Sequence, residues 1–402
     1  MTKSEQLESF NHVTRNVGPL VQARINALQI GQKMQDLPEA LWHDSFRFYV
    51  KEDPTRRGGP NLRLIRLDPT KPSLTVTAFV YNKFVHPYEN RYITPREAAR
   101  LQDFPDTFLF KGTLTSVQQQ VGNAVPLRLG WAVAKAILKH ARQYGTLDDY
   151  LKSDPKRIPI LSLFTGVGGL DMGFDSELLK SDGVAFAAAA CVEFDKACCR
   201  TLSANLGHAI EPTDIRQVES ARGYLRQMAG IDAVPLIIGG PPCQAFSQAG
   251  RQKADADDRG RMIFEYLRVV GELRPTYFVM ENVANLKGVS GGGLFAATLA
   301  QMKDLGYTVK PYKLSAADYG TAQLRQRLVF IGVRDPYPVV EPPERTHTSA
   351  GEIETLGVAV RPHRTVGEAF AGLPALMPVG ARSKVAGRTN AAKAASLSSA
   401  SP

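Results

Sequence analysis

Short apolar runs alternate with helical patterns through the second half of the chain. The runs are ILSLF, AFAAAACVEF, AVPLIIGG, TYFVMEN, YTVKPYKL and RLVFIGVR. Strands that alternate with helices predict a parallel sheet with helices on both faces. The last two runs lie close together in sequence, so we expect an antiparallel hairpin at one edge of the sheet. The predicted fold class is therefore α/β, with a doubly wound and mostly parallel sheet.

The first half is less regular. After an apolar helical pattern, TRRGGPNLRLIRLD and SLTVTAFVYN predict a loop and strands. TPREAARL predicts a short helix with Thr94 as its N-cap and Pro95 at its first position. LRLGWAVAKAILKHARQYG predicts a longer amphipathic helix that ends before Gly145. DDYLKSDPKRIP follows as a polar linker, and the Ala- and Ser-rich tail from about Ser383 is expected to be disordered.

Composition narrows the class of partner. The 402 residues carry a formal net charge of +10, which favours a polyanion, although a mildly basic globular protein would have the same charge. The longest apolar run, Val184 to Val192, is too short to span a bilayer, and the start MTKSEQLESF has no signal-peptide core. We therefore expect a cytoplasmic protein. The cysteines predict neither a metal site nor a disulfide framework, because they lack paired spacing: Cys191, Cys198, Cys199 and Cys243.

A glycine-rich turn follows the first strand of the sheet, where ILSLF runs into TGVGGLDMGF. Such a turn between strand and helix lets a ligand approach the main chain closely. No Gly-Lys-Ser/Thr follows, and Asp171 occupies the third glycine position of the dinucleotide fingerprint. The turn therefore suits a ligand without phosphates, such as S-adenosylmethionine, or it serves packing alone. Glu193, which closes the next strand, could bond ribose hydroxyls, and Asp214 could accept from an adenine amino group.

LIIGGPPCQAFSQAG places Cys243 directly after two prolines at the carboxyl end of a strand. The prolines restrict the main chain there, and chemistry collects at that edge of open α/β sheets. A lone cysteine is usually a buried apolar residue, but one held in this way is a candidate nucleophile. No histidine is adjacent, so a Cys–His protease pair is not indicated.

Two further blocks carry polar side chains to the same region. RPTYFVMENV places Glu281 at the end of the next strand, on the edge of Cys243. AQLRQRLVF places Gln323, Arg325 and Arg327 at alternating positions, so on a strand they would face one way. The arginines form either a solvated basic face or a fork of donors aimed at a base oxygen or a phosphate.

Together these blocks resemble the DNA (cytosine-5) methyltransferase family. SLFTGVGGLDMGF is similar to its motif I, GGPPCQAFS to motif IV, MENV to motif VI and QLRQR to motif VIII, with Ala322 where the family often has proline. TPREAARLQDFPD resembles motif IX, and QQVGNAVP resembles motif X. The resemblance implies a Rossmann-like, S-adenosylmethionine-dependent catalytic domain with a small target-recognition domain.

The motif order differs from that of the family, in which motifs IX and X follow the target-recognition region. Here they precede motif I, which implies a circular permutation. The expected divisions are a recognition region at 1–90, a motif IX–X segment at 91–145 that completes the catalytic domain, the catalytic domain itself at 146–340, a connector to the recognition domain at 341–382 and the tail at 383–402.

The resemblance also implies a mechanism. Cys243 adds to C6 of a flipped cytosine in duplex DNA, Glu281 bonds N3 and the exocyclic amine, and Arg325 and Arg327 hold the O2 side. The polar stretch from Ser247 to Arg261 would close over the DNA. The expected cofactor-binding residues are Phe164, Thr165, Gly166, Gly168, Gly169, Leu170, Glu193, Phe194, Asp214, Ile215, Pro241 and Asn123. The expected DNA-binding residues are Arg56, Arg57, Gln244 and Ser247, with the arginines as readers of guanine.

The expected role is bacterial restriction-modification or solitary methylation by a monomer that uses no metal, with or without an endonuclease acting on the same site. Three other interpretations remain. An RNA cytosine-5 methyltransferase acting on tRNA would have the same pocket motifs. A DNA-binding protein that lost catalysis is opposed by the intact Cys243, Glu281 and Arg327, and a nicotinamide-dependent oxidoreductase is opposed by the missing third glycine.

Overall fold

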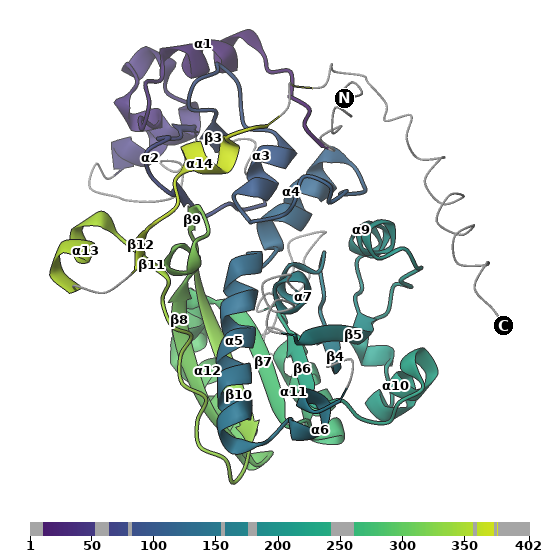
Figure 1. Ribbon diagram of the computed structural model, residues 1–402. Helices are drawn as coiled ribbons and strands as arrows, with labels where there is room; N and C mark the ends of the chain where they lie inside the picture. The colour runs from purple at the N-terminus through teal and green to yellow at the C-terminus, as the bar shows by residue number, and fades with distance from the viewer. Residues whose placement is uncertain are drawn as a thin grey trace, which may run out of the picture.

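A six-stranded sheet formed by residues 157–334 lies at the centre of the lower part of the protein in Figure 1. The structure is a computed structural model that describes residues 11–52, 64–78, 83–153, 157–175, 183–242, 261–356, 360–373 and 376. The strand order is β5–β4–β6–β7–β10–β8. The strands are β4 (Arg157–Leu163), β5 (Ala185–Val192), β6 (Leu236–Gly239), β7 (Tyr277–Val283), β8 (Tyr307–Ser315) and β10 (Gln326–Arg334).

The pairing confirms the predicted α/β class. Strands β5, β4, β6 and β7 pair in parallel, whereas β10 is antiparallel to both β7 and β8. The antiparallel pair of the last two runs therefore lies at one edge, as expected. The connections contain α7 (Gly169–Phe174), α9 (Lys196–Leu206), η5 (Ile215–Gln217), α10 (Ala221–Ala229), α11 (Arg261–Leu273), η6 (Ala284–Gly292), α12 (Gly293–Asp304) and η7 (Ala316–Tyr319).

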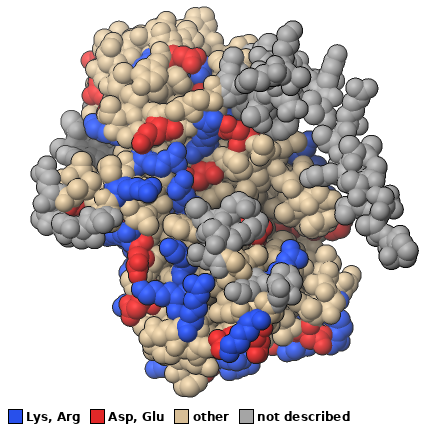
Figure 2. Space-filling model, in the orientation of Figure 1, with Lys and Arg blue, Asp and Glu red and all other residues tan. Residues whose placement is uncertain are grey.

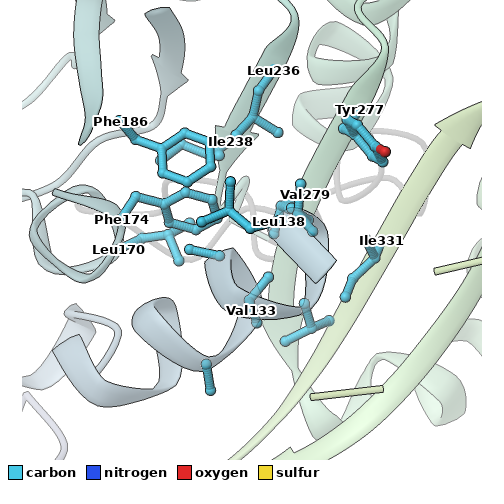
Figure 3. Packing of buried hydrophobic residues seen from close by; sticks show 14 of the residues in the cluster. Val133, Leu138, Leu170, Phe174, Phe186, Leu236, Ile238, Tyr277, Val279 and Ile331 are labelled. Atoms are coloured by element: carbon cyan, nitrogen blue, oxygen red, sulfur yellow. The ribbon is translucent and has the colours of Figure 1, made fainter. Parts of the chain in front are cut away.

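Alternate side chains of the strands enter two separate cores. Leu236 and Ile238 of β6 pack with α5 (Leu127–Tyr144) and α7 on one face, as Figure 3 shows. Ile237, between them, packs with α10, α11 and α12 on the other face. Because successive strand residues point to opposite faces, both faces of the sheet are covered by helices. This is the doubly wound arrangement that the sequence predicted.

Helix α5 belongs to the first half of the chain but packs on the sheet of the second half. It has the predicted bounds, and Gly145 ends it in the left-handed conformation at φ +67°. A Cβ atom on Gly173 of α7 would lie 2.5 Å from Leu127 O and 2.7 Å from Gly130 Cα. The main chains of α5 and α7 therefore approach so closely that glycine is required at this crossing.

The remaining first-half elements form a unit above the carboxyl ends of the strands (Figure 1). One hydrophobic core joins its parts across the expected boundary at residue 90: it contains Ile65 and Phe84 as well as Phe104 and Val121, and also Val366 near the end of the described chain. The elements are α1 (Pro19–Ala27), η1 (Met34–Asp36), η2 (Glu39–Leu41), α2 (Asp44–Glu52), β1 (Ile65–Arg66), β2 (Ser73–Leu74), β3 (Phe84–Val85), α3 (Pro95–Arg100) and α4 (Leu114–Asn123).

Helix α3 begins as predicted, since the Thr94 side chain accepts from the Glu97 main-chain N–H and Pro95 is the first helical residue. Of the run SLTVTAFVYN the structure describes residues 73–78, in which Ser73–Leu74 is the strand. Ser73–Leu74 pairs in parallel with β9 (Gln323–Leu324), and Phe84–Val85 pairs with Ile65–Arg66.

The linker and the C-terminal segment complete the described chain. A short helix, α6 (Asp148–Leu151), lies in the linker after α5. The C-terminal segment contains β11 (His347–Thr348), α13 (Ala350–Leu356), β12 (Arg361–Pro362) and α14 (Val366–Phe370), and it returns to the upper unit. The tail expected to be disordered lies outside the described residues. Within the described part of the chain, no helix is long and apolar enough to cross a membrane.

The α5–α7 contact yields a stability prediction. Gly173→Ala should lower the free energy of unfolding by about 1–3 kcal/mol, because the added methyl group must push apart two main chains. Gly223→Ala in α10 is the matched control, since its Cβ would meet no atom closer than 3.5 Å. Chemical denaturation followed by circular dichroism would measure both. Equal stability of the two variants would contradict the close crossing.

Candidate functional site

The carboxyl ends of β4, β5, β6 and β7 border one cavity of about 620 Å³. In open α/β sheets this edge is where ligands bind, because the loops after the strands diverge there. Ten of the twelve residues expected to bind a cofactor line the cavity: Asn123, Phe164, Thr165, Gly166, Gly169, Leu170, Glu193, Phe194, Asp214 and Ile215. The two exceptions are Gly168, which caps α7, and Pro241, whose carbonyl accepts from the Asn282 side chain while Pro242 lines the cavity.

Asn123 reaches the cavity although it lies 41 residues before Phe164 in the sequence. It is the last residue of α4, and α5 follows after a short turn. The close packing of α5 on α7 holds this turn beside the glycine-rich loop. The segment at 91–145 therefore contributes to the same cavity as the strands of the second half.

Glu193 follows β5 and is held by two main-chain donors. The Gly166 N–H donates to Oε2 at 2.6 Å, and the Asp195 N–H donates to Oε1 at 2.7 Å. Burial raises the pKa of the Glu193 carboxyl to about 7, although these hydrogen bonds lower it. Each oxygen keeps a second lone pair that could accept a hydroxyl proton from a ligand. The side chain is thus oriented by the glycine-rich turn itself.

Asp171 is a cavity residue that the sequence interpretation noted only as a missing glycine. Burial raises the pKa of its carboxyl to about 6, opposed by a hydrogen bond with Ser162. Its Oδ1 atom is buried and has no hydrogen-bond partner among the described residues. A buried acceptor without a partner is costly, so this oxygen is available to a donor on a ligand. A polar residue immediately after the Gly-Gly-Leu of the turn was the signal that could have identified it.

Two residues border the cavity nearer to solvent. Phe194 directly follows Glu193 and keeps 55% of its surface exposed, which leaves an aromatic face for a planar ligand. Asp214 caps the short helix η5, and its carboxylate also pairs with Arg216 at 2.5 Å. That pair lowers the pKa of Asp214, so the carboxylate is ionised at neutral pH. Arg261 and Met262 at the start of α11 complete this side, and the sequence did not indicate them as cofactor residues.

Glu281 lies in the same cavity and forms an ion pair with Arg327. Their Nε and Oε1 atoms are 2.7 Å apart, and the side chains are 12% and 13% exposed. Arg327 stands opposite Val283 in the antiparallel pairing of β10 and β7, which brings the two motifs together. A carboxylate and a guanidinium at the mouth of a partly dry cavity can offer an acceptor and donors to one planar ring.

Gln323 and Arg325 do not share the environment of Arg327. Both are buried, at 0% and 1% exposure, so they are not a solvated basic face. The two Nη atoms of Arg325 donate to the main-chain carbonyls of Val76 and Gly122 at 2.8 and 2.9 Å. The alternation expected of one strand is broken at Arg325, which lies between β9 and β10. Arg325 therefore meets the main chain of other segments in this structure.

Cys243, Gln244, Ser247, Arg56 and Arg57 lie outside the described residues, as does most of the expected closing loop. The described chain ends at Pro242 on the cavity and resumes at Arg261, also on the cavity. Among the described residues, no group of three or more His, Cys, Asp or Glu side chains could hold a metal ion.

Basic side chains gather on one face of the protein, along and above α5 (Figure 2). Helix α5 itself carries Arg128, Lys135, Lys139 and Arg142. Acidic side chains are interspersed among them, and Lys139 pairs with Glu344. The face is thus mixed in charge, within a chain of net charge +10.

Comparison with known proteins agrees with this geometry. The chain is 34% identical over 232 residues to the Type II methyltransferase M.AquIA of Picosynechococcus sp., a match that covers 54% of this chain and 90% of that protein. It is 39% identical over 203 residues to M1.HphI of Haemophilus parahaemolyticus, covering 50% of this chain and 51% of that one. It is 34% identical over 230 residues to M.SacI of Streptomyces achromogenes, covering 54% and 58%. The chain thus spans most of the first relative and about half the length of the other two.

The sequence profile of one family matches residues 3–139 and 158–363, which is most of the chain. The two matched blocks meet in space at the cavity, where Asn123 of the first block lies with Phe164, Glu193 and Glu281 of the second. The chain belongs to the C-5 cytosine-specific DNA methylase family.

Proposed function

We propose that this protein transfers a methyl group from S-adenosylmethionine to C5 of a cytosine within a specific site of duplex DNA. The observation that supports this best is one cavity that holds both Glu193, beside the glycine-rich turn, and the Glu281–Arg327 pair. With Glu193 available to the methyl donor and Glu281 available to the base, one cavity could hold both reactants of a methyl transfer side by side.

The residues of the cavity fit the proposed donor. Glu193 could accept from two ribose hydroxyls, Phe194 could stack on the adenine, and the unpartnered Oδ1 of Asp171 could accept from an ammonium or amide group. S-adenosylmethionine supplies an electrophilic methyl group on a sulfonium. No phosphate needs to be held, which agrees with a turn that lacks a Walker lysine.

The chain's own groups would act on the base. The Cys243 thiolate adds to C6, which breaks the aromatic ring and makes C5 nucleophilic. Glu281 accepts from the exocyclic amine and delivers a proton to N3, which neutralises the negative charge that the addition puts on the ring, while Arg327 donates to the O2 side. After methylation C5 loses its proton, the C6–S bond breaks, and the thiolate leaves. To reach this cavity, the cytosine must be flipped out of the base stack of the duplex, because its ring atoms are inaccessible inside the stack.

The relatives carry names of Type II methyltransferases, so we propose the same restriction-modification role for a monomer of this chain, with an endonuclease acting on the same site. Recognition of the target sequence is proposed to lie in residues 10–90, with Arg56 and Arg57 as the first candidates for base readout.

We further propose that the chain is a circular permutation of the usual motif order. Two features support it. His12 lines one surface cavity together with Leu373 and Leu376, so the two ends of the described chain lie side by side. The polar stretch at 145–156 links α5 to β4. Joining the ends and opening this stretch would restore the usual order without moving any element.

The nucleophile is tested by trapping. Cys243→Ser should reduce methyl transfer to duplex DNA by at least about three orders of magnitude, because a hydroxyl without a base is a poor nucleophile. DNA with 5-fluorocytosine at the target should form a covalent complex with the wild type, since fluorine cannot leave as a proton does. Cys191→Ala, which removes another thiol, should keep the trap. Trapping by Cys243→Ser, or methylation of tRNA in place of DNA, would contradict the proposal.

The cofactor site predicts a pH dependence. Hydroxyl donors bind ionised Glu193, so affinity for S-adenosylmethionine should rise with pH up to about 7, where this carboxyl titrates in the free protein. Below that pH the dissociation constant of S-adenosylmethionine should rise by up to about tenfold for each pH unit. For stability the sign is opposite: the raised pKa adds stability below about 4.5 that is lost as the pH rises to about 7. Calorimetric titration of wild type and Glu193→Gln tests this, because the variant should lose the pH dependence.

The permutation is tested by rearranging the whole chain. A chain that begins at Pro155, runs to Pro402, continues into Met1 and ends at Asp154 should fold, and its rate of methyl transfer should stay within about tenfold of the wild type. A control chain with the same joined ends, opened between Gly130 and Trp131 inside α5, should not fold. A loss of cooperative unfolding in the first chain would contradict the proposed equivalence of the two orders.

A further inference from the structure

Arg325 joins three parts of the protein that are far apart in sequence. Its side chain is 1% exposed and lies between β9 and β10. Nη1 donates to the carbonyl of Val76 at 2.8 Å, and Nη2 donates to the carbonyl of Gly122 at 2.9 Å. Gly122 precedes Asn123 on the cavity, and Val76 belongs to the region expected to recognise DNA. One side chain thus connects the recognition region, the cavity and the strand that carries Arg327.

The main chain around Val76 is held from both sides; we call residues 73–78 the docking segment. The Val76 N–H donates to Gln323 Oε1 at 2.7 Å, and the Thr75 hydroxyl donates to the Leu324 carbonyl at 3.0 Å. A Cβ atom on Gly122 would lie 2.3 Å from the main-chain nitrogen of Ala78. The docking segment is therefore packed between the end of α4 and residues 322–325, and it cannot shift without moving one of them.

From Arg325 the chain continues directly into β10, which carries the arginine of the ion pair. Arg327 is two residues beyond Arg325 and bonds Glu281 at 2.7 Å. Burial holds the pKa of Arg325 well below its usual range, repulsion from Arg327 lowers it further, and attraction to Glu281 opposes both. Glu281 therefore interacts with two guanidinium groups, one in contact and one through space. A displacement of Arg325 would change the electrostatic environment of both members of the pair.

The sequence alone suggested that Arg325 holds the base. Both of its terminal nitrogens already donate to main-chain carbonyls, and its Nε has no partner among the described residues but is itself buried. To reach a base, the side chain would have to leave two hydrogen bonds and strand two buried carbonyls, each at a cost of about 1–3 kcal/mol. The geometry of Arg325 therefore fits a role in holding the main chain next to the Arg327–Glu281 ion pair and not a role in contacting the base.

We propose that Arg325 is a positioning residue that couples the docking segment to the Arg327–Glu281 pair, so that seating of the recognition region on its target sets the geometry of catalysis. The proposal rests on the methyltransferase function proposed above. It assigns specificity a second route: a mismatched site would lower the rate of the chemical step as well as the affinity for DNA.

The first experiment uses Arg325→Lys, which keeps the charge but cannot hold both carbonyls. We expect kcat for methyl transfer to cognate duplex to fall at least about thirtyfold, whereas KM for DNA and the dissociation constant of S-adenosylmethionine change less than threefold. Arg334→Lys is the matched control. It lies at the other end of β10, donates to the Arg274 carbonyl, and should leave all three constants unchanged.

A double-mutant cycle with Arg327→Lys separates positioning from direct contact. If Arg325 acts through Arg327, the double variant should be no slower than Arg327→Lys alone. Independent effects that multiply would overturn the proposal, and so would a loss confined to KM for DNA. An inactive wild type would instead refute the proposed function, so the two failures are distinguishable.

If Arg325→Lys does not fold, the variant Thr75→Val tests the same coupling between the docking segment and the ion pair. It removes one hydrogen bond between the docking segment and β9 without changing the volume of the side chain. We expect kcat to fall about two- to fivefold, and the ratio of kcat/KM between cognate and single-mismatch duplexes to narrow by a similar factor, with unchanged cofactor affinity. An unchanged kcat together with an unchanged ratio would overturn the coupling.

Discussion

The close crossing of α5 and α7 is the contact on which the site depends. At Gly173 the two helices meet main chain to main chain, which leaves no room for a side chain. Such an approach buries apolar surface on both helices and fixes their relative position. Because only three residues separate the end of α4 from the start of α5, fixing α5 also fixes Asn123 beside the glycine-rich turn. The cavity is therefore completed by helix packing and not by a covalent neighbour.

Electrostatics within the cavity follow from partial burial. Burial raises the pKa values of Glu193 and Asp171 because it disfavours their charged forms. Glu281 forms an ion pair with Arg327. Removing one member of a buried pair leaves an uncompensated charge, so the Glu281–Arg327 pair constrains both strands that carry it. The site is thus organised for ligands that bring hydrogen-bond donors.

Contacts between the recognition region and the catalytic strands use the main chain on one side. Gln323 and Arg325 are side chains, but their partners on the docking segment are the N–H and C=O of Val76. Hydrogen bonds to the main chain depend on where a residue lies and not on its type. At Val76 the contact with the catalytic strands therefore depends on the position of the main chain, whereas the Thr75 hydroxyl, which donates to the Leu324 carbonyl, adds a contact that depends on the side chain.

The sequence predicted the local elements correctly: the strands from ILSLF to RLVFIGVR, the antiparallel edge pair, the Thr94 cap and the end of α5 at Gly145. These depend on periodicity, turns and caps, which act over a few residues. Ten of the residues expected from the family resemblance line the cavity; of these, the glycine-rich turn, Glu193 and Asp214 were also indicated by their places after the strands of a parallel sheet. The pairings of β1 with β3 and of β2 with β9, the unpartnered Oδ1 atom of Asp171 and the burial of Arg325 were decided by tertiary structure alone. Val76 and Arg325 are separated by 249 residues, and no local pattern encodes which carbonyl a distant guanidinium will meet.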